Sequence, residues 1–330
     1  MKKGKISESI LKRSVLKYIH TENSEIIKGA GIGSDCAFLG WDDPSLKAAV
    51  ITTQTMTLPV KEAGKLAVYA AINNLAASGA EAVAVTIAMT LPEETLESRL
   101  QELMRQIKEV CSRFKIQIAG GHTEISDTVK APVITVTGFG KAVLPEKVKN
   151  EDPKSMDIVM TKWIGLEGTV ILSKEKEKEL LTRYPMHLIT SAQGFEKYLP
   201  VWPEAATAHK SGVYAMHDVR NGGVFGSLWE LSKSMGVGLS IDLKSIPVKQ
   251  ETIEICEFFD LNPYELLSGG CLLLAAADGK GLVKILEEEE IPAAVIGETT
   301  DSNDKVIMNE EEIRFLEPAK PDEIFKVNFI

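Results

Sequence analysis

Three short segments of this sequence combine closely spaced glycines with an acidic residue, a combination suited to binding phosphate and Mg²⁺. The first is Gly29–Asp35, which reads Gly-Ala-Gly-Ile-Gly-Ser-Asp. Glycines this close together let the backbone turn several N–H groups toward one anion, and Asp35 stands where it could hold a cation. A P-loop is excluded because no Gly-Lys-Ser/Thr follows, and a flexible surface turn is the competing interpretation.

The second segment is Gly120-Gly121-His122-Thr123-Glu124, a predicted turn at the end of a predicted strand. The Glu124 carboxylate could bind Mg²⁺, which takes oxygen ligands and usually keeps waters and substrate phosphates in its shell. His122 is a poor ligand for this ion. The competing interpretation is a tight turn with a glutamate on the surface.

The third segment, His217–Gly223, lies between an apolar strand and an amphipathic helix and is the strongest local signal. Gly222 and Gly223 at a helix N-terminus would expose N–H groups to a phosphate, and Asp218 could carry its Mg²⁺. The competing interpretation is Asp218 as a simple N-terminal cap of the helix. The three turns together predict magnesium–phosphate handling, but they do not name a substrate.

The bulk composition narrows the class of partner. The chain has 330 residues, with 37 Lys and Arg against 47 Asp and Glu, and a formal net charge of −10. A nucleic-acid site needs clustered basic side chains, so a nucleic-acid partner is not expected. No stretch approaches the ~20 apolar residues of a membrane span, so we expect a cytoplasmic protein with no membrane contact. The four cysteines are widely scattered, which predicts reduced, buried side chains.

Predicted strands and helices alternate along the chain, which indicates an α/β (α+β) fold, but the connections are too uneven for a Rossmann repeat. Predicted strands cover 47–54, 83–89, 116–119, 133–139, 157–161, 213–216, 239–243, 271–276 and 294–296. The length favours two domains, and the polar, proline-bounded segment 145–153 suits a linker. We therefore predict one domain over 1–147 and a second over 148–330.

Two helices are predicted in the first domain. Small and apolar residues repeat at helical spacing over 61–78, and Gly79 stands where a left-handed glycine would end the helix. Asn74 falls on the apolar stripe of this helix and therefore requires a hydrogen-bond partner. The second helix is predicted to open at Thr90–Glu93, which has a capping-box pattern and an early proline.

Five motifs occur here in the order in which they occur in one enzyme superfamily. They are Gly31–Ala37, Thr52–Gln54, Ile72–Ala80, Gly120–Glu124 and His217–Gly223. With the Gly-Leu-Glu-Gly of 165–168 and the Leu-Leu-Ser-Gly-Gly of 266–270, the sequence resembles the aminoimidazole ribonucleotide synthetase-like (AIR synthase-related) superfamily. Within it, HypE-like hydrogenase expression/formation proteins are the most similar.

The resemblance implies a two-domain fold in which an N-terminal mixed sheet forms a barrel across a homodimer and a C-terminal α/β domain follows. It also implies ATP with Mg²⁺ in a cleft between the domains, and transfer or activation of phosphate on an amide-like acceptor. By matching positions, the metal ligands would be Asp35, Glu124 and Asp218, and Asp35 and Asp218 would take the catalytic roles. The matching nucleotide-binding positions are Gly31, Gly33, Thr53, Gln54, Asn74, Gly121, Gly222 and Gly223.

Three positions depart from the superfamily pattern, because Ser34, Gln54 and Asn74 stand where carboxylates are usual. A neutral oxygen can still coordinate Mg²⁺ but adds no charge beside a triphosphate, so metal affinity should fall. A homodimeric binding or regulatory protein that kept the fold is therefore the alternative function. HypE uses a C-terminal cysteine; this tail has none, so its cyanide-forming reaction is not expected, and Cys36 is predicted to fill the core.

Overall fold

The computed structural model describes residues 7–19, 24–40, 48–142 and 152–329. Its backbone contacts divide the chain into two compact units. The N-terminal unit comprises 23–29, 35–144 and 328–330, and the C-terminal unit comprises 1–22, 30–34 and 145–327. The predicted domain boundary between 147 and 148 lies outside the described residues and stays a prediction.

The N-terminal unit contains a six-stranded mixed sheet in the order β1-β2-β3-β6-β4-β5. Its strands are β1 (Ile26–Lys28), β2 (Ala37–Leu39), β3 (Ala48–Met56), β4 (Glu81–Leu91), β5 (Gln117–Ile125) and β6 (Val133–Ala142). Only β4 and β5 pair in parallel, and the other neighbours are antiparallel. The order departs from the chain sequence, which agrees with the expectation of a mixed sheet and no Rossmann repeat.

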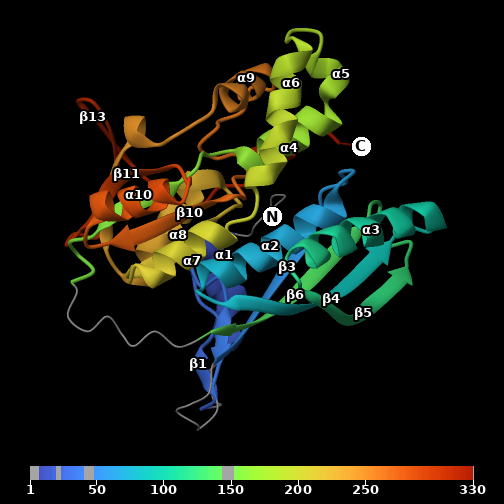
Figure 1. Cartoon of the computed structure of the whole chain (residues 1–330), viewed down its shortest axis with the longest axis horizontal. Coiled ribbons are helices and arrows are strands. Elements are labelled where there is room, and N and C mark those ends of the chain that lie inside the picture. Colours follow the sequence, from blue (N-terminus) through green and yellow to red (C-terminus); the bar gives the residue numbers. More distant parts are fainter. Residues whose placement is uncertain (1–6, 20–23, 41–47, 143–151, 330) are drawn as a thin grey trace. The chain divides into compact units, whose positions relative to one another are not determined.

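Two helices, α2 (Ala63–Ala77) and α3 (Glu97–Arg113), cover one face of this sheet (Figure 1). In β3 the side chains of Thr52 and Gln54 point toward this helix-covered face, and those of Thr53 and Thr55 point to the opposite, outward face. The prediction of a helix ended by glycine is confirmed, because Gly79 adopts φ 71° directly after α2. However, α2 is buried on nearly every side and not along one stripe.

Two local predictions in this unit are wrong. The helix predicted to open at Thr90 begins only at Glu97, because β4 continues to Leu91. Thr90 pairs with Val133 on one side and Glu124 on the other, and pairing on both sides outweighs a local capping signal. The predicted turn at 120–124 is likewise strand, since β5 continues beside β4 through both glycines to Ile125.

The C-terminal unit contains a seven-stranded mixed sheet in the order β13-β12-β9-β11-β7-β10-β8. Its strands are β7 (Asp157–Thr161), β8 (Ala215–Val219), β9 (Gly238–Asp242), β10 (Cys271–Ala276), β11 (Ala293–Thr300), β12 (Lys305–Asn309) and β13 (Glu312–Phe315). Its helices are α1 (Glu8–Ser14), α4 (Leu166–Glu175), α5 (Glu177–Leu180), α6 (Met186–Gln193), α7 (Trp202–Lys210), α8 (Gly223–Met235), α9 (Gln250–Phe258) and α10 (Gly279–Glu288). The strands predicted at 157–161 and 271–276 are confirmed to the residue.

Both faces of this second sheet are covered, which explains the uniformly apolar strand β10. Leu273 joins the core beneath α8, together with Leu228 and Ile158. Alternate residues of β10 face the other side, where α7 and α10 pack. The helix α1 belongs to this unit, since Glu8 accepts a hydrogen bond from the Trp229 indole of α8 at 2.6 Å.

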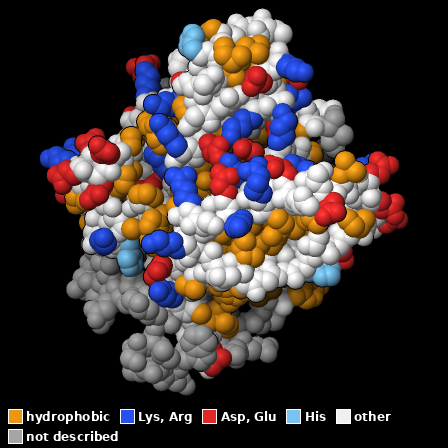
Figure 2. Space-filling model, turned by 45° about the vertical axis from the view of Figure 1, so that its right-hand side comes forward, with side chains coloured by type: hydrophobic (Ala, Val, Ile, Leu, Met, Phe, Trp, Pro, Cys, Tyr) orange, Lys and Arg blue, Asp and Glu red, His pale blue; other side chains and the backbone are white. Residues whose placement is uncertain are grey.

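None of the four cysteines forms a disulfide, and all four are buried, as the scattered spacing predicts. No helix among the described residues is long and apolar enough to cross a membrane. On the face drawn in Figure 2, basic and acidic side chains are interleaved among the described residues. Ion pairs join some oppositely charged side chains of the chain, such as Arg105 and Glu102 on α3 at 2.7 Å.

Candidate functional site

The turn between β8 and α8 depends on two glycines in the left-handed region. Gly222 caps α8 with φ 80° and Gly223 follows with φ 62°. A Cβ on Gly223 would lie 2.3 Å from the carbonyl oxygen of Tyr264, whereas the nearest atom to one on Gly222 would be 3.5 Å away. Gly223 is therefore required both by backbone conformation and by close packing, and Gly222 by conformation.

Asp218 lies inside β8, opposite Leu272 of β10, and is only 5% exposed. The interpretation of Asp218 as the cap of α8 is wrong, because the strand continues to Val219 and Gly222 is the N-cap. The neighbouring His217 points to the opposite sheet face, where its Nε2 lies 3.3 Å from the Glu230 carboxylate of α8. The strand thus places a buried carboxylate directly before a glycine turn.

Arg220, which follows β8, forms a buried two-point ion pair with Glu167 in the first turn of α4. Its Nε and Nη2 donate to the two Glu167 oxygens at 3.0 and 2.9 Å. Burial alone lowers the pKa of Arg220, but the charges of Glu167, Asp218 and Asp322 outweigh it, and the pKa is raised. The guanidinium therefore stays charged, and its charge partly balances that of Asp218.

The backbone N–H groups at the start of α8 already have acceptors within the protein. Gly222 N–H donates to Asp322 Oδ2 at 2.7 Å, and Gly223 N–H donates to the Arg220 carbonyl at 3.2 Å. Phe225 N–H donates to the Tyr264 carbonyl at 3.3 Å. Sequence reasoning assigned two of these groups, on Gly222 and Gly223, to a phosphate; the structure shows that a side-chain carboxylate already lies at this helix N-terminus. Direct phosphate binding by the two glycines stays a prediction.

Gly31 and Gly33 belong to the C-terminal unit, although Asp35 next to them belongs to the N-terminal unit. Gly33 has φ 70°, and a Cβ there would lie 2.3 Å from the carbonyl oxygen of Glu230 in α8. Gly31 has open space, with nothing nearer than 3.8 Å. Close packing on α8 is thus a structural reason for glycine at 33 and not at 31.

In the N-terminal unit, the backbone of Asp35 is held by Thr52 and Asn74. The Thr52 hydroxyl donates to the Asp35 carbonyl at 2.9 Å, and Asn74 Nδ2 donates to the same carbonyl at 3.3 Å. Asn74 Nδ2 also donates to Thr52 Oγ1 at 3.1 Å. The prediction that buried Asn74 needs a partner is confirmed. A carboxylate at 74 could not make these bonds because it has no N–H.

Cys36 follows Asp35 and lies in a small apolar cluster with Val50 and Leu75. Its thiol donates to the Asn74 carbonyl at 3.3 Å. Burial raises the pKa of this thiol to about 12, so it is protonated at neutral pH and is no nucleophile. Its prediction as core filler is confirmed.

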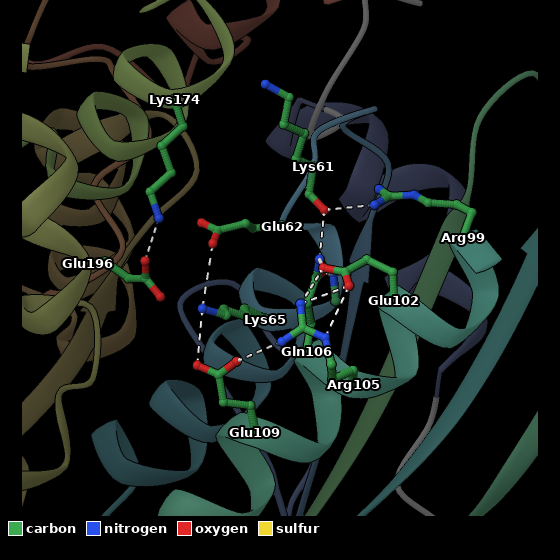
Figure 3. A network of polar contacts seen from close by, with 11 residues as sticks. Lys61, Glu62, Lys65, Arg99, Glu102, Arg105, Gln106, Glu109, Lys174 and Glu196 are labelled. Carbon is green, nitrogen blue, oxygen red and sulfur yellow. Dashed lines mark hydrogen bonds and ion pairs between the residues drawn. The ribbon is translucent and has the colours of Figure 1, made fainter.

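Helix α2, which carries Asn74, is anchored at its start by a polar network from α3 (Figure 3). Arg99 and Gln106 both donate to the Lys61 carbonyl, at 3.0 and 2.9 Å. Gly64 N–H in turn donates to Gln106 Oε1 at 3.1 Å. These contacts supply acceptors and donors to the first turn of α2 and fix its position on α3.

The other predicted residues of this unit lie on different faces of its sheet. Thr53 bonds Thr137 at 3.1 Å on the outward face, whereas Gln54 points to the face covered by α2. Gly121 lies in β5, where a Cβ would be 1.9 Å from the Ile87 carbonyl oxygen, so close pairing with β4 requires glycine there. Thr53 and Gln54 therefore cannot contact one ligand from the same side of the sheet.

Glu124 is on the outward face, near the end of β5, with a side chain 54% exposed. Its oxygens lie 3.4 Å from the Thr90 hydroxyl and from His122 Nε2. No group of three His, Cys, Asp or Glu side chains within the described ranges is placed to hold a metal ion. Mg²⁺ commonly binds through one or two carboxylates plus substrate phosphates, so the carboxylate chemistry fits an ion that enters with a nucleotide.

Sequence reasoning missed Asp322, which contributes to the turn after β8 from the far end of the chain. The only local signal was weak. An Asp directly after Pro321 is typical of an N-cap, and Asp322 does cap a short 3₁₀ helix at Glu323–Lys326. Arg220 and Glu167 were visible within motifs but were not singled out. Their pairing joins residues 53 apart, which no local pattern reveals.

Two family models match the chain. Residues 33–142 match the N-terminal domain of AIR synthase related protein, and residues 156–309 match its C-terminal domain. The ranges together cover most of the chain, and each falls largely within one structural unit.

Individual relatives match over most of the chain. A putative hydrogenase expression/formation protein of Methanocaldococcus jannaschii is 24% identical over 314 residues, which cover 92% of this chain and 91% of that protein. Carbamoyl dehydratase HypE of Cupriavidus necator is 25% identical over 230 residues, 68% and 63% of the two chains. A crystal structure of HypE in complex with ATP aligns with a TM-score of 0.68 at 16% identity, over 98% of this chain and 97% of that one. The structural likeness shows the fold.

Proposed function

Because the chain belongs to the AIR synthase related family, we propose that it binds ATP together with Mg²⁺ and transfers or activates phosphate on an amide-like acceptor. The observation that supports this best is the buried carboxylate of Asp218, next to Arg220 and directly before the glycine turn of α8. An ATP complex of a HypE with the same fold adds support for the nucleotide.

The proposed ligands of the metal are Asp35, Glu124 and Asp218, with Asp35 and Asp218 in the catalytic roles. Bound Mg²⁺ would supply positive charge to the phosphate oxygens. Phosphoryl transfer depends mainly on positioning and on charge stabilisation, so the contribution of this chain would be to orient the nucleotide and exclude water. Asn74 and Thr52 would act by holding the Asp35 backbone in place.

Calorimetric titration with a non-hydrolysable ATP analogue tests this proposal. We expect Mg²⁺-dependent binding that weakens by about tenfold or more in Asp218→Asn, since that change leaves an oxygen in place but removes the negative charge that would offset the metal. Asp301→Asn, which alters an exposed carboxylate paired with Lys154, is the matched control and should bind normally. Equal binding by all three proteins, or none by the wild type at millimolar nucleotide, would refute the proposal.

The second candidate function is a binding or regulatory protein that kept a nucleotide site and lost turnover. Asn74 favours this candidate, because its amide is used as a structural donor where relatives of the superfamily carry a carboxylate. Ser34 and Gln54 are neutral as well. Measurement of phosphate release and of labelled ATP products over hours separates the two: binding without turnover supports the second candidate.

We further propose a homodimer built on the outward face of the N-terminal sheet. Within the described residues, β5 pairs only with β4, and side chains on the outward face such as Thr53 and Thr55 are exposed. A second copy of the chain would cover this face and extend the edge. Light scattering should report a dimer that Thr137→Lys, on the outward face, converts to a monomer, while Lys108→Ala on α3 does not; a monomeric wild type would disprove it.

A further inference from the structure

We propose that Asp322 is a positioning residue of the nucleotide site, acting through the turn after β8 and the loop before β10. The inference rests on the proposed function, because it concerns the turn that carries Asp218 and Arg220. It adds a residue that none of the glycine and acid motifs contains. It also assigns a role to a segment beyond the family-model match, which ends at residue 309.

Asp322 connects two loops that are distant in sequence. Its Oδ2 accepts from Gly222 N–H at 2.7 Å, and its Oδ1 accepts from Leu267 N–H at 3.0 Å. Oδ1 also accepts from Ile324 N–H at 3.0 Å, which fixes the carboxylate on its own segment. One side chain therefore sets the distance between the turn after β8 and the loop before β10.

The loop before β10 also reaches the start of α4. Gly168 N–H donates to the Leu267 carbonyl at 2.8 Å, and Gly165 N–H donates to the Ser268 hydroxyl at 2.8 Å. Ser268 N–H donates to the Arg220 carbonyl at 3.1 Å. Hydrogen bonds thus join the turn after β8, the loop before β10 and the start of α4 next to the Asp322 carboxylate. The Arg220–Glu167 ion pair connects the first and the last of these segments. A displacement of Asp322 would move the backbone on which Asp218 and Arg220 depend.

Water cannot readily replace this carboxylate. Asp322 is 4% exposed, and the segment before it covers the turn: a Cβ on Gly222 would lie 3.5 Å from the Lys320 carbonyl oxygen. A Cβ on Gly226 would lie 3.3 Å from that of Ala319. Loss of the carboxylate would therefore leave buried N–H groups without an acceptor.

The arrangement also explains why the side chain is acidic and not an amide. Both oxygens face N–H donors, so an Asn must turn its own NH₂ toward either Gly222 or the pair Leu267 and Ile324. Either orientation sets donor against donor. Arg220 and Glu167 are the charged side chains whose electrostatic interaction with this carboxylate is resolved among the described residues.

Asp322→Asn tests the inference, with Glu323→Gln as the matched control. Glu323 is also buried, but its carboxylate accepts from Asn262 N–H and not from the turn. We expect Asp322→Asn to weaken Mg²⁺-dependent binding of the ATP analogue by about tenfold or more, as loss of an outer-shell partner does, and Glu323→Gln to leave it unchanged. The ratio of affinities with and without Mg²⁺ should fall toward one only in Asp322→Asn, which a general loss of stability would not produce.

An NMR measurement separates this inference from the proposed function. The amide proton of Gly222 should shift upfield in Asp322→Asn and stay in place in Glu323→Gln, whether or not nucleotide binds. If the wild type binds no nucleotide, the proposed function fails while this shift still reports the Asp322 contact. Unchanged affinity in Asp322→Asn despite the shift, or no shift at all, overturns the positioning role.

If Asp322→Asn does not fold, hydrogen exchange on the wild type replaces it. The ATP analogue with Mg²⁺ should slow hydrogen exchange at Gly222, at Leu267 and across 318–326. The reason is that the Asp322 carboxylate links these amides to the turn that carries the proposed nucleotide site. Slower exchange elsewhere with no change at these amides would overturn the inference.

Discussion

The two units hold their acidic segments in opposite ways. In the N-terminal unit, the neutral amide of Asn74 donates hydrogen bonds to the Asp35 carbonyl and to Thr52. In the C-terminal unit, the Asp322 carboxylate accepts hydrogen bonds from backbone N–H groups, including that of Gly222. We call Asn74 and Asp322 anchors, because each holds a distant backbone group. The first anchor donates to a backbone carbonyl, and the second accepts from a backbone N–H at the N-terminus of a helix.

This difference teaches why the superfamily pattern of carboxylates cannot be transferred position by position. At 74 the protein needs a donor, so an amide is favoured even where relatives carry an acid. At 322 it needs an acceptor for N–H groups at a helix N-terminus; these donors favour the charged carboxylate, but burial disfavours it more strongly. The first anchor should be independent of pH, and the second should titrate.

The largest effect is expected for Asn74→Asp. The variant loses both donated hydrogen bonds and places a carboxylate against the Asp35 carbonyl, so the free energy of unfolding should fall by about 4 kcal/mol. The deficit should shrink as the pH is lowered, because a protonated acid can donate again. Asn74→Leu, which removes the bonds without adding charge, should lose about half as much. Urea denaturation measures all three proteins, and equal losses in both variants would show that charge is irrelevant at this anchor.

The second prediction concerns the pH dependence of the Asp322 anchor. Burial raises the pKa of Asp322 to about 6, and the three N–H groups lower it only in part. The folded-state pKa of Asp322 lies above its unfolded value, so folding favours the protonated acid. The contribution of Asp322 to the free energy of unfolding is therefore fully present below about pH 4 and is lost as the pH rises through 6. The expected change is about 3 kcal/mol in the free energy of unfolding of the wild type minus that of Asp322→Asn. A flat difference between pH 4 and 7 would mean that the carboxylate is not perturbed.

The smallest expected effect is the difference in stability between alanine variants of the two glycines in the turn after β8. Gly222→Ala should cost about 1 to 2 kcal/mol, the usual penalty for a left-handed residue. Gly223→Ala should cost about 1 to 2 kcal/mol more, because its Cβ would also meet the Tyr264 carbonyl oxygen at 2.3 Å. Thermal denaturation of both variants gives the difference, and equal melting temperatures would contradict the close approach.

Local pattern predicted much of the fold where burial was uniform. The strands at 157–161 and 271–276 are largely apolar and are interior strands of their sheet, so no competing signal obscured them. The helix after Gly222 and the partner required by Asn74 were predicted for the same reason, since an apolar pattern demands a core. Prediction was wrong at Thr90 and at 120–124, where strand pairing with distant segments outweighed capping and glycine signals.

The sequence by itself determined which residues could do chemistry and which family they resemble, because glycine, acid and amide side chains carry their chemistry wherever they lie. Tertiary structure alone decided how those residues are held. Asp322 reaches Gly222 across 100 positions and Leu267 across 55, and Asn74 reaches Asp35 across 39. Hydrogen bonds at such separations depend on how sheets and helices pack, and no local pattern encodes that packing.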